Sequence, residues 1–394
     1  MAKRRVGIIG AGIVGTALAY YLSEYDNVEV TVFEKNSIGS GTTAKSAGTV
    51  CLFDDSVTHE FWPVRLKGFQ TYTAMEEEDE GSAGFQKTGT LVVATDQEVE
   101  DFVLEGIAKA RAAGYSGEYL TDHDAIHKII PDLSLEGVLG AGYTPDDGFF
   151  DATMIANTYA TKARANGAKV MIFTEVSGVK LEGGRVAGVQ TPKGDLSLDV
   201  VVDATGPWAR FTSRMAGLEL PIWHTKAEVF VLEPRPQLEY LFPVLKYPRF
   251  YARREQSDVF ICKAHLTMDL SDPVHAGIWD PDELPLTGGT EEYFLDFLFG
   301  ELEKHYPRLL NTGIKNDWVG YRAETPDFLP ILGDTPVEGY LLNVGYGGNG
   351  VIEAAAAGTD LAAYIATGKK SALLERLPFS RFEESGGSPR EANP

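Results

Sequence analysis

The N-terminal stretch constrains the fold of this chain more than any other part of its sequence. An apolar run, Val6–Ile9, predicts a buried parallel strand and is followed by Gly10-Ala-Gly12-Ile-Val-Gly15. A helical stretch, Thr16–Leu22, and a second strand, Val28–Phe33, come next, and Glu34 follows that strand directly. Strand, glycine turn, helix, strand and acid in this order form the dinucleotide-binding fingerprint of a Rossmann βαβ unit.

The glycines of this fingerprint each have a physical role in binding a dinucleotide. Gly10 permits the tight turn, and Gly12 allows the backbone to approach a pyrophosphate held by free N–H groups and the helix dipole. Gly15 allows the helix to pack closely on the strand. Glu34 follows at roughly the 20-residue spacing of a ribose-binding acid, and its charge disfavours the 2′-phosphate of NADP. The pattern predicts an ADP-containing cofactor; the alternative is a glycine-rich turn that binds nothing.

The bulk composition is that of an ordinary globular protein of two or three domains. The chain has 394 residues, of which 44% are hydrophobic and 23% charged. Its two cysteines, Cys51 and Cys262, are too few for a disulfide framework or a metal cluster. A cytoplasmic location and no metal site are therefore expected. No run approaches about 18 apolar residues, and glycines cut the apolar stretch after the basic residues 1–5, so neither a membrane span nor a signal peptide is expected.

The chain is strongly acidic. Its 57 acids and 35 bases leave a formal net charge of −22 at pH 7. Nucleic acid is therefore not an expected partner, because binding it requires a basic face. Two interpretations of the charge remain open: an ordinary solvated acidic surface, and adaptation to a high-salt cytoplasm in which surface acid keeps proteins soluble.

A small, hydroxyl-rich segment, residues 36–50, follows the acid of the fingerprint. It contains Gly39-Ser-Gly-Thr42-Thr43-Ala-Lys45-Ser46-Ala47-Gly48. Such a loop can offer backbone N–H groups and hydroxyls to phosphates while it passes close to a flat ring. The alternative is a flexible surface turn, which its place directly after Glu34 disfavours.

Hydrophobic periodicity and breaker residues predict alternating helices and strands along the chain. Helices are expected at 58–79, 97–112, 123–130, 152–166, 291–306 and 351–366, and strands at 88–95, 168–173, 175–181, 186–191, 196–202, 225–232, 250–253, 259–263 and 340–344. The run Asp199-Val-Val-Val-Asp-Ala-Thr205-Gly206 predicts a buried strand that ends in a Thr-Gly turn. Ligands bind at the carboxyl ends of strands in open α/β sheets, so this turn is expected beside the cofactor.

The middle and the end of the chain differ in character. Residues 220–318 favour β structure, carry many aromatic side chains and include a long loop at 269–285, as expected of a substrate-binding domain. The glycine-rich loop Gly345–Gly350 then precedes a helix and makes a second helix N-terminus with positive potential. The expected division is a discontinuous cofactor domain of residues 1–80, 145–218 and 319–380, a substrate domain of residues 81–144 and 219–318, and a flexible tail of residues 381–394.

Three blocks of the sequence resemble the FAD-dependent D-amino-acid oxidase superfamily, which includes glycine oxidase, sarcosine oxidase and D-amino-acid dehydrogenase. They are Gly10–Glu34, Val201–Trp208 (Val-Val-Asp-Ala-Thr-Gly-Pro-Trp) and Trp318–Gly350. The last resembles the family's segment W-x-G-x-R, T-P-D, P-I-x-G and G-x-G-G-x-G. The resemblance covers nearly the whole chain. It implies an α/β fold with a Rossmann-like FAD-binding domain of the glutathione-reductase type and a second, α+β substrate-binding domain built on a mixed β-sheet.

The resemblance also implies the cofactor. The family's C-terminal glycine loop lies beside the flavin ring, so the implied cofactor is FAD rather than NAD. Covalent flavin in monomeric sarcosine oxidases uses a cysteine at a position that falls near Gly320 here, and neither cysteine of this chain is near it, so noncovalent FAD is expected. The implied FAD-binding residues are Gly10, Gly12, Ile13, Val14, Gly15, Glu34, Lys35, Thr42, Thr43, Lys45, Ser46, Ala47, Gly48, Val176, Ala204, Thr205, Gly206, Trp208, Gly320, Arg322, Gly347, Gly348, Asn349, Gly350, Val351 and Ile352.

Three residues are implied to act on the substrate. Arg322 matches the carboxylate-binding arginine of glycine oxidase, and a planar guanidinium suits that task. Tyr251 resembles the site tyrosine of the same enzyme. Lys263 resembles the lysine near flavin N5 that helps oxygen react in sarcosine oxidases, by its positive charge. The alternatives are an ion pair for Arg322, a core aromatic for Tyr251 and an exposed strand lysine for Lys263.

The implied activity is oxidation of a small amine or amino acid (a D-amino acid, glycine, an N-methyl amino acid or proline). Hydride transfer to flavin N5 gives an imine that hydrolyses. Two alternatives remain: a 2-hydroxy-acid dehydrogenase, and the β subunit of a multi-subunit amine dehydrogenase. The electron acceptor is left open between oxygen, a quinone and an electron-transfer protein, as is assembly into a homo-oligomer or hetero-complex.

Overall fold

A six-stranded sheet forms around the fingerprint in the computed structural model, which describes residues 3–52, 61–264 and 289–382. Its order is β18-β19-β12-β1-β2-β8. The strands are β1 (Arg4–Ile9), β2 (Val28–Phe33), β8 (Lys169–Met171), β12 (Val200–Asp203), β18 (Ile331–Asp334) and β19 (Tyr340–Val344). All neighbours pair in parallel except β18, which lies antiparallel at one edge. The central strands are almost wholly buried, as expected of a parallel sheet covered on both faces.

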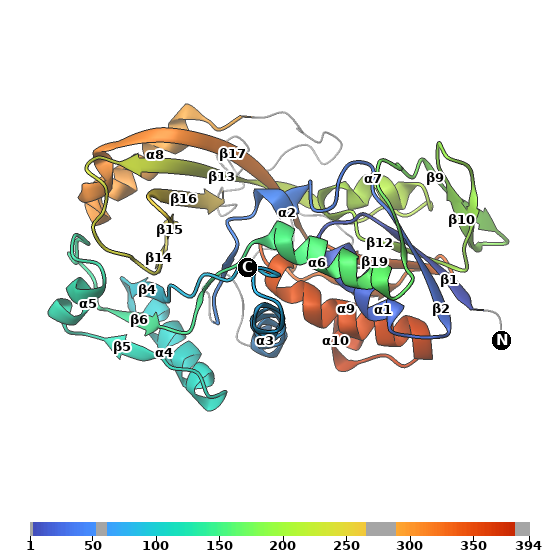
Figure 1. Ribbon diagram of the computed structural model, residues 1–394, viewed down its shortest axis with the longest axis horizontal. Coiled ribbons are helices and arrows are strands. Elements are labelled where there is room, and N and C mark those ends of the chain that lie inside the picture. Colours follow the sequence, from blue (N-terminus) through green and yellow to red (C-terminus); the bar gives the residue numbers. More distant parts are fainter. Residues whose placement is uncertain (1–2, 53–60, 265–288, 383–394) are drawn as a thin grey trace.

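Helices and a small sheet cover the two faces of this sheet. Helices α1 (Ile13–Ser23), α6 (Ala152–Ala165) and α9 (Gly350–Thr367) lie together on one side, where α1 packs against both others (Figure 1). A Cβ at Gly358 would stand 3.1 Å from Leu18 N, so this glycine allows α9 to approach α1 closely. The other face packs against an antiparallel sheet of β9 (Gly178–Glu182), β10 (Arg185–Gln190) and β11 (Leu196–Ser197).

An eight-stranded sheet forms the second half of the molecule, on the left in Figure 1. Its order is β17-β13-β16-β15-β14-β4-β6-β5. The strands are β4 (Thr90–Ala94), β5 (Glu118–Leu120), β6 (Gly140–Thr144), β13 (Trp223–Pro234), β14 (Val244–Tyr247), β15 (Phe250–Glu255), β16 (Asp258–Ala264) and β17 (Thr312–Glu324). Helix α8 (Glu292–His305) packs its apolar stripe, including Phe294, Leu298 and Leu302, into the core of this sheet.

The remaining elements connect or flank the two large sheets. They are α2 (Thr42–Lys45), β3 (Thr49–Val50), α3 (Trp62–Glu78), α4 (Gln97–Ala112), α5 (His123–Ile129), β7 (Gly148–Phe149), α7 (Ala209–Arg214), α10 (Ala372–Arg376) and the short 3-10 helices η2 (Gly206–Trp208), η3 (Pro307–Leu310) and η4 (Phe379–Phe382). Helix α3 crosses α9 at Gly68, where a Cβ would stand 1.8 Å from Ile352 O. The α/β fold class is confirmed.

Most expected elements are present, and the differences have physical causes. The expected strand 196–202 is split, because Leu198 N bonds to Ala187 O of β10 whereas Asp199 N bonds to Arg5 O of β1. The chain therefore changes sheet between these two residues. The pattern did not predict several elements: strands β3, β5, β6, β7, β14, β17 and β18 and helices α2, α7 and α10. The expected loop 269–285 lies outside the described residues, as does most of the expected tail.

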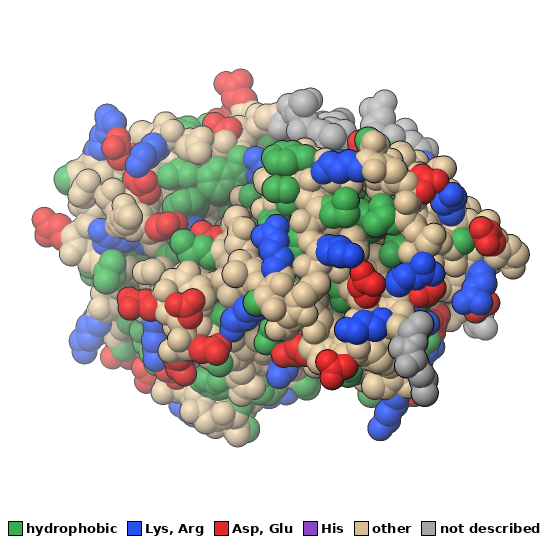
Figure 2. Space-filling model, turned by 45° about the vertical axis from the view of Figure 1, so that its right-hand side comes forward, with side chains coloured by type: hydrophobic (Ala, Val, Ile, Leu, Met, Phe, Trp, Pro, Cys, Tyr) green, Lys and Arg blue, Asp and Glu red, His purple; other side chains and the backbone are tan. Residues whose placement is uncertain are grey.

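Charged side chains of both signs are interspersed over the face shown in Figure 2, with apolar groups between them. Within residues 3–52, 61–264 and 289–382, no helix is both long and apolar enough to cross a membrane. The same described ranges contain no cluster of His, Cys, Asp and Glu side chains that could hold a metal ion.

Candidate functional site

A cavity of about 1070 Å³ runs from the fingerprint to the eight-stranded sheet. The turn after β1, the segment around α2, the turn after β12, strands β13 to β17 and the glycine loop before α9 all contribute to its lining. Every residue implied to bind FAD lines this cavity except Gly15 and Gly48. Arg322, Tyr251 and Lys263 line it too.

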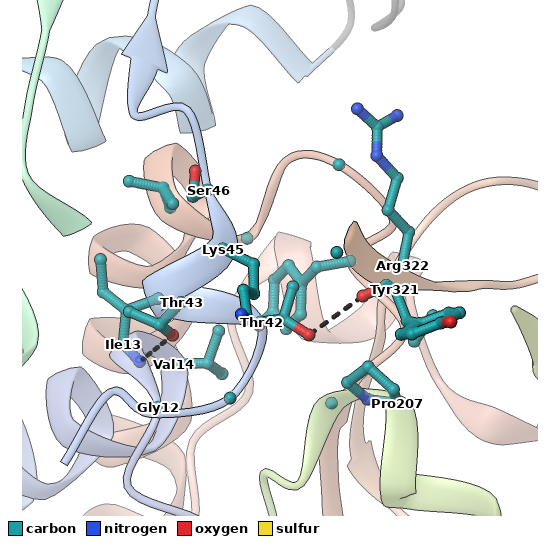
Figure 3. A pocket seen from close by; sticks show the side chains of 18 of the residues that line it. Gly12, Ile13, Val14, Thr42, Thr43, Lys45, Ser46, Pro207, Tyr321 and Arg322 are labelled. Atoms are coloured by element: carbon teal, nitrogen blue, oxygen red, sulfur yellow. Dashed lines mark hydrogen bonds between the residues drawn. The ribbon is translucent and has the colours of Figure 1, made fainter. Parts of the chain in front are cut away.

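The fingerprint glycines shape the end of the cavity at the start of α1. Gly10 has a φ of +102°, and a Cβ there would stand 2.6 Å from Ala204 O. Helix α1 begins after Gly12, which has no side chain to cap it. Thr43 Oγ1 accepts a hydrogen bond from Ile13 N at 3.1 Å (Figure 3). Gly15 lies beneath this turn, where a Cβ would stand 2.0 Å from Gly10 O. Gly15 therefore supports the turn from behind.

Glu34 is held at the end of β2 by two backbone groups. Its Oε2 accepts a hydrogen bond from Ala11 N at 2.9 Å and its Oε1 from Asn36 N at 2.7 Å. Both bonds fix the carboxylate at the cavity wall, beside the turn that opens α1. Next to it, Lys35 Nζ lies 4.1 Å from the centre of the Trp208 ring.

The segment around α2 is fastened to the eight-stranded sheet. Thr42 Oγ1 donates to Tyr321 O at 3.0 Å (Figure 3). Lys45 O accepts from Trp318 Nε1 at 3.1 Å. A Cβ at Gly320 would stand 3.2 Å from Lys45 Cβ, so glycine eases this close approach. These contacts join the segment around α2 to strand β17 at the cavity wall.

Buried groups brace the same segment from below. Arg253 donates from Nε to Ala47 O at 2.6 Å, and its guanidinium lies 4.1 Å from the ring centres of both Phe149 and Phe260. Gly48 has a φ of +68°, and a Cβ there would stand 2.0 Å from Phe150 O. Gly48 thus lies outside the cavity and serves the packing of the loop.

The turn after β12 is anchored by Asp203. Its Oδ1 accepts from Thr205 N at 3.0 Å and from Thr205 Oγ1 at 2.6 Å, and its Oδ2 accepts from Ser213 Oγ and Tyr340 OH. Burial raises the pKa of the Asp203 carboxyl to about 6, while these donors oppose the rise. The turn presents Ala204, Thr205 and Gly206 to the cavity.

The C-terminal glycine loop closes the opposite wall. Gly347 has a φ of +51°, its N donates to Ala323 O at 2.8 Å, and a Cβ there would stand 2.4 Å from Glu324 Oε2. A Cβ at Gly348 would stand 2.8 Å from Arg322 Cζ, so the Arg322 guanidinium lies directly against this backbone. The second helix N-terminus, that of α9, opens here without a side-chain cap.

Arg322 and Tyr321 leave strand β17 in opposite directions (Figure 3). Arg322 lies opposite Thr225 of β13, and two pairs further along the same face Trp318 lies opposite Val229. Burial raises the pKa of the nearby Glu324 carboxyl, although the charge of Arg322 opposes this, and Thr225 Oγ1 donates to Glu324 Oε1 at 2.9 Å.

The face of the eight-stranded sheet supplies a row of facing side chains. Lys246 of β14 lies opposite Tyr251 of β15, Tyr251 opposite Cys262 of β16, and Cys262 opposite Val229 of β13. Tyr251 borders the cavity but lies deep among protein atoms, and burial raises the pKa of its hydroxyl well above the ordinary value. This row forms part of the cavity wall that the eight-stranded sheet supplies.

Lys263 lies beside this row rather than in it. It is the residue after Cys262 and lies opposite Glu228, so its side chain leaves the strand from the other face. Its Nζ donates to Pro248 O at 2.6 Å, although the residue also borders the cavity.

Three polar residues of the site escaped the sequence analysis. Lys246 is 7% exposed and lines the cavity, Arg65 of α3 donates to Cys51 O and Asn349 Oδ1, and Asp203 holds the turn after β12. Asp203 stood inside a quoted motif and could have been found there. Lys246 and Arg65 depend on strand register and helix packing, which no local pattern reports.

The residues of this cavity fit FAD. Glycines at positions 10, 12, 347 and 348 let the cavity wall pack tightly, because a Cβ at any of them would crowd a neighbouring backbone or side-chain atom. The N-termini of helices α1 and α9 both open into this cavity. Glu34, which follows the first of them at the sequence spacing of a ribose-binding acid, lines the same cavity. FAD has two groups that suit the positive potential of a helix N-terminus: its anionic pyrophosphate and its flavin ring.

Known proteins share this architecture along nearly the whole chain. A solved L-proline dehydrogenase from P. horikoshii superposes with a TM-score of 0.82 at 28% identity, covering 98% of this chain and 99% of that chain. Glycine oxidase from Geobacillus kaustophilus (strain HTA426) is 26% identical over 389 residues, 97% of each protein. Dimethylglycine dehydrogenase from Rattus norvegicus is 27% identical over 390 residues, which are 95% of this chain but 44% of that protein. The chain thus spans less than half the length of this dimethylglycine dehydrogenase.

The family comparison covers most of the chain. The profile described as "DAO: FAD dependent oxidoreductase" matches residues 5–364, which include the fingerprint, the Thr-Gly turn and the C-terminal glycine loop. This chain therefore belongs to the DAO family of FAD-dependent oxidoreductases.

Proposed function

We propose that this chain oxidises a small amino acid at a C–N bond, with FAD as hydride acceptor. The relatives named L-proline dehydrogenase, dimethylglycine dehydrogenase and sarcosine dehydrogenase all take amino acids whose nitrogen carries an extra carbon substituent. Proline and N-methyl amino acids are therefore the favoured substrates within the wider set of glycine and D-amino acids. When bound, FAD supplies the hydride-accepting chemistry, and the oxidised product is an imine that water hydrolyses.

The position of Arg322 carries this proposal. Its guanidinium lies against Gly348, at the junction of the glycine loop and the eight-stranded sheet, and it can hold a carboxylate through two parallel hydrogen bonds. A carboxylate held there directs the rest of a small amino acid along the wall formed by Tyr251. Orientation of this kind supplies much of the rate enhancement when a cofactor performs the bond chemistry.

We propose that FAD is held noncovalently. Burial raises the pKa of both the Cys51 and the Cys262 thiols, which keeps them protonated and unreactive. Acid precipitation should therefore release the flavin into the supernatant. The two large sheets are the cores of the two proposed domains, with FAD held mainly by residues 1–80, 145–218 and 319–380.

Three finer points belong to the same proposal. The chain acts in the cytoplasm, where two buried thiols stay reduced. Its electron acceptor is oxygen, a quinone or an electron-transfer protein, and the speed of reoxidation in air distinguishes the first from the others. Activity on its own distinguishes a self-sufficient enzyme from one subunit of a larger complex.

Anaerobic bleaching of the flavin tests the function. We expect proline or an N-methyl amino acid to reduce the flavin, and Arg322→Lys to raise the substrate concentration needed for half-maximal reduction by about 30-fold or more, since it keeps the charge but loses the bidentate geometry. Arg185→Lys is the matched control, because Arg185 pairs with Glu338 on the surface. Bleaching by 2-hydroxy acids but by no amino acid would overturn the proposal, as would an unchanged response in Arg322→Lys.

A further inference from the structure

Three basic residues line the part of the cavity that the eight-stranded sheet supplies. Lys246 comes from β14, Lys263 from β16 and Arg322 from β17, and all three line the cavity. The protein as a whole is acidic, with 57 acids and 35 bases, so a group of basic residues contrasts with its overall charge. Proposed substrate binding employs one of the three, Arg322, for a carboxylate.

Lys246 and Arg322 stand on either side of Tyr251. Lys246 lies opposite Tyr251 on the neighbouring strand, on the same face, and its Nζ is 5.7 Å from the centre of the Tyr251 ring. The charge of Arg322 acts on the Tyr251 hydroxyl from β17. A small substrate that lies along Tyr251 therefore has a cation toward each of its ends.

The electrostatics of this part of the cavity favour a negatively charged ligand. Lys246 is 7% exposed, and burial, together with the charges of Lys263 and Arg322, lowers the pKa of its ammonium. The acids among the described lining residues are Glu34, Glu175, Asp317 and Glu324. Glu324 is the one beside Arg322, and its burial favours the neutral form. An anion next to Lys246 would offset the repulsion that this buried lysine feels from the charges of Lys263 and Arg322.

Lys246 is better placed than Lys263 for this role. The Lys263 side chain leaves its strand on the face away from Cys262, and its Nζ donates to Pro248 O at 2.6 Å. Lys246 belongs to the row that faces the cavity, and an ammonium carries three donors, so it can serve a ligand as well as a protein acceptor.

We propose that Lys246 binds a second acidic group of the substrate, so that this site takes an amino acid with two carboxylates, one held by Arg322 and the other by Lys246. The inference rests on the proposed function, because it takes the Arg322 carboxylate as given. It narrows the substrate to small, N-substituted amino acids with an acidic side chain or an acidic N-substituent. Lys246 is thus a specificity-determining residue.

Inert acids test the inference by binding alone. Propanoate, malonate, succinate and glutarate are titrated into the oxidised holoenzyme, and affinity is read from the change in flavin absorbance and from calorimetry. We expect at least one diacid to bind about tenfold or more tightly than propanoate, the gain of one charge-assisted contact. The chain length that binds best then reports the separation of the two cations.

Variants of Lys246 test whether this lysine causes the tighter binding of diacids. Lys246→Met should remove the diacid advantage while leaving the affinity for propanoate within about twofold, and Lys246→Arg should keep the advantage. Lys180→Met is the matched control, since Lys180 pairs with Asp195 on the surface of the three-stranded sheet. Circular dichroism and flavin content verify that each variant is folded and loaded.

The outcomes separate this inference from the proposed function. Bleaching by proline or an N-methyl amino acid, with diacids no tighter than propanoate in the unaltered protein, overturns the inference and leaves the function standing. Equal loss of propanoate and diacid affinity in Lys246→Met also overturns it, because the residue then acts on the site as a whole. Failure of every acid to bind, with no bleaching by any amino acid, overturns both.

Discussion

At the scale of single residues, Glu34 shows how one carboxylate can organise a binding turn. It accepts hydrogen bonds from Ala11 N and Asn36 N, so it joins the glycine turn after β1 to the chain after β2. Both acceptor oxygens are already oriented when a ribose arrives, and this orientation costs the ligand nothing. The residue therefore has a structural task and, in the proposed binding of FAD, a binding task as well.

Replacement of Glu34 should weaken cofactor binding. Glu34→Gln keeps the shape but loses a charged acceptor and presents an N–H₂ group where an acceptor stood, so we expect the Kd for FAD to rise by about 10- to 100-fold. Fluorescence titration of the apoprotein measures it. Glu29→Gln on the same strand is the control, because Glu29 pairs with Lys169 on the surface. An unchanged Kd for Glu34→Gln would show that the acid does not contribute to binding.

Residues differed in how far the sequence could predict them. Gly10, Gly12 and Glu34 stand at fixed local spacing, so their place at the cavity follows from the pattern of one βαβ unit. Lys246 faces the cavity only because β14 pairs with β15 in one register, and a shift by one residue would turn it to the other face. That register depends on tertiary pairing, which a single sequence does not display.

At the scale of elements, helix α9 begins with a buried acid. Glu353 lies in its first turn and is 3% exposed, and burial raises the pKa of its carboxyl to about 8, while the charge of Arg65 opposes the rise. The folded protein therefore keeps a proton on Glu353 that the unfolded chain releases above its ordinary value of 4.5. Between these two values, stability falls as the pH rises.

Glu353→Gln should remove this pH dependence, because an amide stays neutral throughout. We expect the variant to gain stability relative to the unaltered protein as the pH rises from about 5 to about 8, by up to about 1.4 kcal/mol per pH unit within the window. Urea unfolding at both pH values measures it. Glu98→Gln on the exposed face of α4 is the control and should show the same small change at both. A constant difference for Glu353→Gln would contradict the explanation.

Elements with strong local signals were predicted well, and those made by tertiary pairing were not. Strands 28–33 and 340–344 and helix 97–112 have the expected bounds, since each has clear periodicity and breakers at its ends. Strand β5, three residues long, exists through its pairing with β6, and β14 through its pairing with β4 and β15. Short strands of this kind carry too few residues for a period to be read.

At the scale of the whole molecule, the net charge of −22 predicts a response to salt. Repulsion between like charges opposes the compact state, and salt shortens its range from about 10 Å at 0.1 M to about 3 Å at 1 M. We expect the thermal midpoint to rise by several degrees over this range and then to level off. Differential scanning calorimetry in KCl measures it. A midpoint that is flat or falls would rule out repulsion, and one that rises steadily to several molar would indicate salt exclusion from the surface instead.

The order of strands in the six-stranded sheet also bears on how the protein is made. Strands β1 and β2 leave the ribosome long before β18 and β19, which complete the sheet beside β12. Until then β12 presents an unpaired edge, and the apolar groups that α9 will cover are exposed. Synthesis therefore passes through a long stage at which the nascent chain lacks both the C-terminal glycine loop of the cavity and the strands that complete the sheet. Truncated products should be held by chaperones or degraded rather than accumulate as partly active enzyme.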